Sequence, residues 1–154
     1  MTAEIITNAE IFLQLFIALL FGALLGIERE YRNKPAGMKT HALVSLGATL
    51  FIILGYHVFY EFGGVEISFD PSRVLAAVVV GVGFIGGGLI IKRQFEVEGI
   101  TTAAGLWITA AVGAAVGVKL YLPALFAVLL TLFVFHGITA FENRFIRKEK
   151  GEDE

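Results

Sequence analysis

Five long runs of apolar residues divide the sequence, and short polar segments separate them. The runs cover residues 11–27, 42–60, 74–91, 103–118 and 122–141. They are apolar on all sides, and most approach the ~20 residues that an α-helix needs to cross a bilayer. None shows the alternation of polar and apolar residues that is typical of membrane β-strands. The pattern predicts an all-α polytopic membrane protein, a bundle of five transmembrane helices in which the runs 11–27 and 103–118 are short for a crossing.

Composition supports lipid as the solvent of this chain. Of its 154 residues, 56% are hydrophobic and 17% are charged, whereas a soluble domain carries about 25% charged residues. The net charge of −2 excludes a generally basic surface, so no nucleic acid is expected as a partner. The sequence holds no cysteine, which removes disulfides, thiolate metal sites and cysteine nucleophiles.

Basic residues are distributed unevenly between the two ends of the predicted bundle. Ten of the 12 Lys and Arg residues fall in the segments 28–41, 92–99 and 142–154, and the other two are Arg73 and Lys119. The positive-inside rule therefore predicts an external N-terminus and a cytoplasmic C-terminus. We expect a transmembrane domain over residues 1–141 and a charged cytoplasmic tail over residues 142–154. No Lys or Arg precedes the first run, so we do not interpret it as a cleavable signal peptide.

Many of the 18 glycines lie within the runs, where small residues allow helices to approach closely in lipid. They are densest in the run 74–91, so we expect that helix at the centre of the bundle, and we expect the bulky run 122–141 to face lipid. The same spacing serves contacts within one chain or between copies, which predicts a homo-oligomer, with a dimer favoured. The expected helix-packing glycines are Gly22, Gly26, Gly81, Gly83, Gly86, Gly87, Gly88, Gly105, Gly113 and Gly117.

The densest polar stretch, residues 28–41, directly follows the first apolar run. Charges within a membrane are usually functional, so one interpretation is that Glu28 and Arg29 fold inward as a charged site. The alternative is an ordinary solvated helix end, in which Glu28 and Arg32 form an i,i+4 pair. A stripe of His41, Ser45 and Thr49 enters the next helix, either to bind something or to form hydrogen bonds between helices.

A second polar segment on the same side precedes the run 103–118. Thr101 and Thr102 are expected to cap that helix, where hydroxyl groups accept hydrogen bonds from free N–H groups. Because the two segments share one side by the charge distribution, they predict a joint cytoplasmic-side site. Its residues are Glu28, Arg29, Arg32, Lys39, Thr40, His41, Ser45, Thr101 and Thr102.

The sequence gives no sign of an enzyme or of a cofactor. Its three histidines come without the nucleophile and orienting group that acyl or phosphoryl transfer requires. The outer loop 61–70 holds three carboxylates, which permits weak attraction of a cation, but its spacing matches no known cation loop. A metal site therefore stays unknown, with Mg²⁺ open as a ligand or a substrate.

Four ordered blocks between about residue 15 and residue 117 resemble the MgtC/SapB family of bacterial and archaeal membrane proteins. They read GALLGIER at 22–29, PAGMKTHALVSLG at 35–47, GVGFIGGG at 81–88 after Arg73, and GITTAAGLWITAA at 99–111. The resemblance implies a multi-pass protein of the cytoplasmic membrane that is tied to growth when magnesium is scarce. For pathogen members it implies regulation through other membrane proteins, such as the ATP synthase.

Some positions depart from the family pattern. Many members have Arg where this chain has Lys39, and others have Gln and Ser where Ala77 and Val80 stand, which weakens any polar path along the third helix. Only about a dozen residues follow the last run, so we expect a short form without the C-terminal cytoplasmic domain. The favoured function is ion homeostasis through contacts with other membrane proteins. The alternatives are direct transport of Mg²⁺ or another small solute, and a structural helix-packing protein without a ligand.

Overall fold

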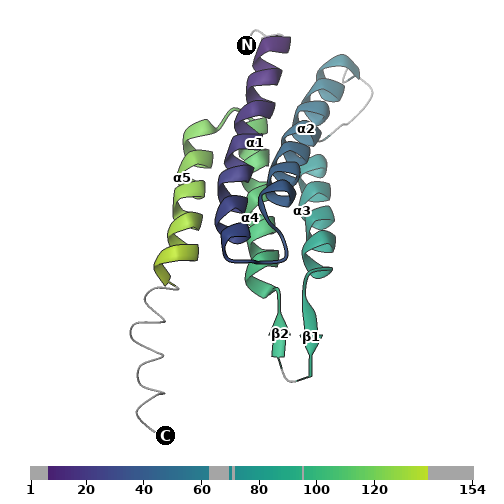
Figure 1. The fold of residues 1–154 in the computed structure, drawn as a ribbon. Helices are drawn as coiled ribbons and strands as arrows, with labels where there is room; N and C mark the ends of the chain where they lie inside the picture. Colours follow the sequence, from purple (N-terminus) through teal and green to yellow (C-terminus); the bar gives the residue numbers. More distant parts are fainter. Residues whose placement is uncertain (1–6, 63–69, 71, 95, 139–154) are drawn as a thin grey trace, which may run out of the picture.

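The computed structural model describes residues 7–62, 70, 72–94 and 96–138, and their helices form one bundle (Figure 1). A two-stranded antiparallel hairpin joins the third helix to the fourth. The elements are α1 (Asn8–Tyr31), α2 (Met38–Phe62), α3 (Ser72–Gly87), β1 (Ile91–Arg93), β2 (Glu96–Glu98), α4 (Ile100–Gly117), α5 (Tyr121–Phe133) and the π-helical turn η1 (Val134–Ile138). The predicted all-α polytopic fold of five helices is confirmed, whereas the hairpin was not predicted.

The fourth helix, α4, is the centre of the bundle. It packs against α1, α2, α3 and α5, and more than half of its residues are buried. The expectation that the glycine-rich third run lies at the centre is wrong, because α3 packs mainly against α4 and α2. Around Gly81, Gly83 and Gly87 no atom of the described residues, apart from the adjoining backbone of α3 itself, lies within 4 Å of the position that a Cβ would take. Glycine density indicates that a helix can be approached, but it does not indicate by what.

Three helix backbones, those of α1, α2 and α4, meet at glycines. A Cβ at Gly22 of α1 would lie 2.5 Å from the carbonyl oxygen of His41, and one at Gly26 would lie 2.5 Å from Cα of Met38. A Cβ at Gly113 of α4 would overlap the carbonyl group of Ser45. In lipid, where no hydrophobic effect drives helices together, this close van der Waals contact holds the bundle.

The helices differ in length from the apolar runs. Helix α1 extends beyond its run to Tyr31, because the charged residues that follow the run are buried within the bundle. Helix α3 ends at Gly87, within a run of three glycines. As a result α1, α2 and α4 are long and apolar enough to cross a membrane, and α3 and α5 are the shorter apolar helices. Most of the acidic loop 61–70, residues 139–141 of the fifth run and the tail 142–154 lie outside the described residues.

The outer surface of the bundle is apolar, as lipid requires. On α5, Ala124 and Val128 are buried against the bundle, while Leu122, Phe126 and Phe133 point outward and are largely exposed. The bulky fifth helix therefore presents its large side chains to the surroundings, as we expected.

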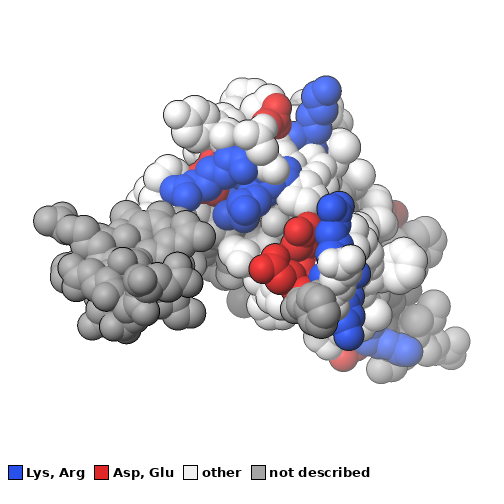
Figure 2. All heavy atoms as spheres, turned by 60° about the horizontal axis from the view of Figure 1, so that its bottom comes forward, with Lys and Arg blue, Asp and Glu red and all other residues white. Residues whose placement is uncertain are grey.

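Both basic loops lie at the same end of the bundle, opposite the N-terminus (Figure 1). Seen from this end, Lys and Arg side chains gather over the α1–α2 loop and the β1–β2 hairpin (Figure 2). The hairpin returns into α4 through Gly99, whose φ of +92° and close approach to the carbonyl group of Leu89 leave no room for a side chain. The chain thus brings residues 28–41 and 92–102 to one end of the fold.

The glycine contacts can be tested by comparing Gly113→Ala with Gly47→Ala. The added methyl group would overlap the Ser45 carbonyl in the first variant but would meet no atom within 4 Å in the second. Overpacking costs about 1–3 kcal/mol, so we expect Gly113→Ala to lower the melting temperature in detergent by about 5 °C, and Gly47→Ala to leave it unchanged or raised. Equal losses in both variants would contradict the assignment of Gly113 to the helix interface.

Candidate functional site: a buried charged cluster

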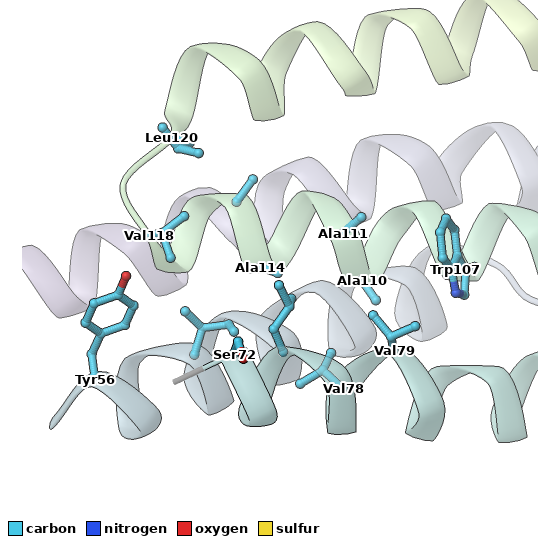
Figure 3. Close-up of a pocket in the computed structure, with 13 residues that line it drawn as sticks. Tyr56, Ser72, Val78, Val79, Trp107, Ala110, Ala111, Ala114, Val118 and Leu120 are labelled. Carbon is cyan, nitrogen blue, oxygen red and sulfur yellow. The ribbon is translucent and has the colours of Figure 1, made fainter. Parts of the chain in front are cut away.

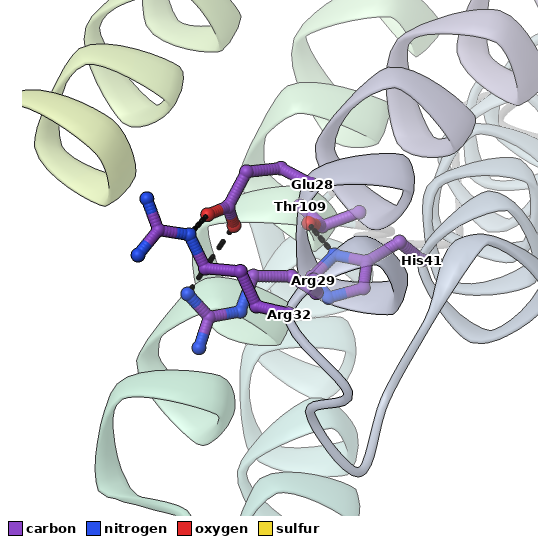
Figure 4. A network of polar contacts seen from close by, with 5 residues as sticks. All are labelled: Glu28, Arg29, Arg32, His41 and Thr109. Carbon is purple, nitrogen blue, oxygen red and sulfur yellow. Dashed lines mark hydrogen bonds and ion pairs between the residues drawn. The ribbon is translucent and has the colours of Figure 1, made fainter.

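The C-terminal end of α1, at the basic end of the bundle, holds two charged residues inside the fold. Glu28 and Arg29 are 5% and 4% exposed. The carboxylate of Glu28 lies between two guanidinium groups, with its Oε1 2.6 Å from Nε of Arg32 and its Oε2 3.3 Å from an Nη atom of Arg29 (Figure 4). Removing ions from water is costly, and mutual pairing offsets that cost. The residues next to the apolar run are therefore packed inward rather than solvated.

An aromatic ring completes the surroundings of Arg29. Its guanidinium carbon lies 4.4 Å from the ring centroid of Phe135, a cation–π contact. Phe135 belongs to the π-helical turn η1, and its ring fills the space beside Gly105 of α4, where a Cβ would lie 2.9 Å from its Cζ. The missing side chain at Gly105 therefore makes room for the ring that supports the buried arginine.

A buried histidine lies beside this pair. Nδ1 of His41 is 2.7 Å from the hydroxyl oxygen of Thr109, and that hydroxyl lies 2.7 Å from the carbonyl oxygen of Gly105, to which it donates (Figure 4). A threonine hydroxyl has one hydrogen to donate. Both contacts are satisfied together only if His41 carries a proton on Nδ1 and donates it to Thr109. The arrangement fixes the tautomer of the histidine.

Several buried polar atoms in this region have no hydrogen-bond partner among the described residues. They include Nε of Arg29, Nε2 of His41 and Oγ of Ser45. With Arg32, the cluster holds two guanidinium groups and one carboxylate. Such unpartnered groups are costly in a low-dielectric interior, so this end of the bundle combines charge with unused hydrogen-bonding capacity.

Further polar side chains follow the α1–α2–α4 interface away from the cluster. The hydroxyl of Thr49 shares its one hydrogen between the carbonyl oxygen of Ser45 in its own helix, at 3.0 Å, and that of Gly113 in α4, at 2.7 Å. Nε2 of Gln14 donates to the carbonyl oxygens of Val116 and Gly117, both at 3.0 Å, at the C-terminal end of α4. The bonds from Thr49 and Gln14 to α4 link neighbouring helices, which is the more usual role of polar residues within a membrane bundle.

The structure brings some of the predicted site residues together and separates others. Glu28, Arg29, Arg32 and His41 form the cluster, whereas Lys39 and Thr40 line a hollow at the surface. Lys39 is exposed and does not join Glu28 and Arg29, and α3 lies at the side of the bundle.

The expectation that Thr101 and Thr102 cap the fourth helix is wrong. The N-cap of α4 is Gly99, and no side chain caps the helix there. Thr101 is exposed, and Thr102 is buried within the first turn. The left-handed conformation of the hairpin return needs a glycine at the position where a threonine cap would otherwise stand.

Sequence reasoning missed two residues of this interior. Phe135 is one apolar residue among many in its run, and nothing in its spacing marks it as the partner of Arg29. The amide of Gln14 caps carbonyl groups at the end of α4, a role that depends on helix pairing that the sequence does not specify. A polar amide in a membrane span was the one available signal.

A separate groove lies between α3 and α4, with a volume of about 520 Å³. Its wall on α4 is formed by small residues, including Ala110, Ala111 and Ala114, and its wall on α3 includes Val78 and Val79 (Figure 3). The lining is almost entirely apolar, so the groove is suited to contact with apolar material and is distinct from the charged cluster. Among the described residues, no group of three His, Asp or Glu side chains could hold a metal ion.

The fold and its interior define a polytopic α-helical membrane protein with a buried charged cluster at its basic end. The sequence pattern of the MgtC family matches residues 15–144. The chain belongs to the MgtC family.

Curated relatives support this assignment. The putative magnesium transporter YhiD of Escherichia coli K12 is 39% identical over 136 residues, which is 86% of this chain and 63% of YhiD. Protein MgtC of Salmonella typhimurium LT2 is 39% identical over 120 residues, which is 78% of this chain and 48% of MgtC. The chain thus spans about half to just under two thirds of the length of these relatives. No solved structure matches it.

The charged cluster predicts unequal effects of one substitution at two ion pairs. Glu28→Gln removes a carboxylate that is 3% exposed and leaves Arg29 buried without a counter-charge, whereas Glu98→Gln breaks the exposed pair of the hairpin. Breaking a buried pair costs about 3–5 kcal/mol, so we expect Glu28→Gln to lower the melting temperature in detergent by about 10 °C. Glu98→Gln should not change it measurably. A small effect at Glu28 would contradict the charge pairing.

The bond between His41 and Thr109 predicts a contrast between two threonines. Thr109→Val leaves Nδ1 of His41 buried without an acceptor, whereas Thr131→Val removes a hydroxyl that donates to the carbonyl group of Ala127 in its own helix. An unsatisfied buried donor costs about 1–3 kcal/mol, so we expect a clear loss of thermal stability for Thr109→Val alone. ¹⁵N NMR of His41 in wild-type protein should show the Nδ1–H tautomer, and an Nε2–H tautomer would contradict the arrangement.

Proposed function

We propose that this protein acts in magnesium homeostasis in the cytoplasmic membrane, through contacts with other membrane proteins and without itself conducting the ion. Membership of the MgtC family supports the association with magnesium, as does the likeness to YhiD, a relative named as a putative magnesium transporter. The gathering of Lys and Arg side chains at one end supports an orientation with that end in the cytoplasm (Figure 2).

The close packing of α1, α2 and α4 is the observation that favours a regulatory role over conduction of Mg²⁺. Mg²⁺ dehydrates reluctantly and usually keeps several water molecules. Where backbones touch at Gly22 and Gly113, the interface is too tight for an added methyl group. Farther along, the polar side chains of Thr49 and Gln14 are bonded to backbone carbonyls. The interior is thus built to join helices rather than to replace the water around an ion.

The outer face of α3 supports a role in association. Gly83 and Gly87 have open space where side chains would stand, and they are four residues apart, a spacing that puts them on one face and at which helices pair in lipid. We propose that this face binds a second copy, as a dimer, or another membrane protein. We also propose that the chain is not an enzyme.

Direct transport is the second candidate, because His41, Ser45, Thr49, Thr109 and Gln14 are all buried between the same three helices. A polar interior of this kind is also a feature of transport paths.

Reconstitution into liposomes loaded with a Mg²⁺-sensitive dye separates the two candidates. We expect Mg²⁺ entry to be no faster than in protein-free liposomes. Entry that depends on the protein and is abolished by Glu28→Gln, in protein shown to be folded, would overturn regulation in favour of transport.

Growth of a bacterium that lacks its own MgtC-family genes tests the role of the α3 face. In limiting magnesium, the wild-type chain should restore growth, and Gly83→Leu should abolish that rescue while the protein stays folded in the membrane, because the bulky side chain blocks helix pairing. Gly81→Leu, at an equally open glycine on a different face of the same helix, is the matched control and should keep rescue. Full rescue by Gly83→Leu would contradict association through this face. Rescue by Glu28→Gln with none by Gly83→Leu would instead indicate a purely structural protein.

A further inference from the structure

The hollow that holds Lys39 and Thr40 is separate from the charged cluster and has a chemistry of its own. It has a volume of about 440 Å³ and lies at the α1–α2 loop, at the basic end of the bundle. Its lining residues are Glu30, Asn33, Lys34, Gly37, Lys39 and Thr40. Unlike the groove between α3 and α4, it is lined mainly by polar groups.

The loop that forms the hollow is held by hydrogen bonds. The backbone N–H of Lys34 donates to the carbonyl oxygen of Arg29 at 2.9 Å, and that of Asn33 donates to Glu30 at 3.0 Å. Asn33 has a φ of +54°, a left-handed conformation that asparagine tolerates. The lining groups are therefore presented by a defined backbone rather than by a loose chain.

The lining of the hollow carries a net positive charge that ion pairs among the described residues do not neutralise. Neither Lys34 nor Lys39 takes part in an ion pair within the described parts of the chain. The one carboxylate in the lining, that of Glu30, accepts a hydrogen bond from the backbone N–H of Met38 at 2.8 Å and is thereby held to the start of α2. The lining therefore holds two ammonium groups and one carboxylate, and the carboxylate is already hydrogen-bonded to the backbone. This balance of charge makes the hollow complementary to an anion.

Apolar side chains around the hollow place it at a lipid boundary. Ile27 and Leu43, within one or two turns of it along α1 and α2, are half or more exposed. Tyr31 is 87% exposed at the end of α1, a position at which tyrosines mark the level of the lipid headgroups. A ligand suited to this depth has an anionic group at one end, which binds in the hollow, and an apolar part at the other end, which lies in the lipid.

We propose that the hollow binds the phosphate group of an anionic phospholipid, with Lys34 and Lys39 as its cationic contacts. The amide of Asn33 and the hydroxyl of Thr40 supply further hydrogen-bond donors, and the acyl chains lie along the exposed apolar residues of α1 and α2. Lysine is a common phosphate ligand in proteins, and each lysine near an anionic headgroup strengthens binding about fivefold. The site is independent of the role in magnesium homeostasis.

Lipid binding to the purified protein in detergent, measured by native mass spectrometry, tests the proposal. We expect wild-type protein to bind phosphatidylglycerol on the order of tenfold more tightly than phosphatidylcholine, since two lysines contribute. The double variant Lys34→Gln/Lys39→Gln should lose this preference. Both side chains are exposed, so the variant should keep the melting temperature of the wild type.

The matched control is Lys92→Gln/Arg93→Gln, which removes two charges from the hairpin at the same end without touching the lining. It should keep the preference for phosphatidylglycerol. Equal preferences in the two double variants, or no preference in the wild type, would overturn the site. Inorganic phosphate in a parallel titration distinguishes the source of the phosphate, and binding of phosphate without phosphatidylglycerol would overturn the assignment to a lipid.

Discussion

Close contact between the backbones of α1, α2 and α4 is the constraint on which the rest of the structure depends. Gly22 of α1 and Gly113 of α4 both bring their helices to van der Waals distance of Ser45 in α2. In lipid this proximity replaces the hydrophobic effect as the source of cohesion. It also forces the polar side chains between the three helices to satisfy one another or the backbone, because no water is present to do so.

The charged cluster depends on that constraint. Glu28 and Arg29 are held at a helix end where solvent would normally separate them, and their ion pair and the contact of Arg29 with Phe135 replace hydration. Burial of this kind is a weak source of stability, because desolvation consumes most of the electrostatic gain. Nε of Arg29 and Nε2 of His41 remain without a hydrogen-bond partner among the described residues, so the cluster is not optimised for stability alone.

The sequence predicted the number of helices and the end at which the charges gather, because hydropathy and loop charge are local properties of the chain. It did not predict that α4 is central, since the open glycines of α3 and the buried Gly113 of α4 look alike until their neighbours are known. The charged cluster was predicted only in part, again because the sequence does not show which residues become neighbours in the fold. Glu28 and Arg29 adjoin an apolar run, but Phe135 and Thr109 join them only through tertiary contacts.

The π-helical turn at Val134–Ile138 places an aromatic ring against the buried arginine. A π-turn closes its hydrogen bonds over five residues instead of four, so it holds one residue more than the α-turn it replaces. The additional residue shifts by one position which side chains of the segment face the neighbouring helices. In this turn the side chain that meets Arg29 is that of Phe135.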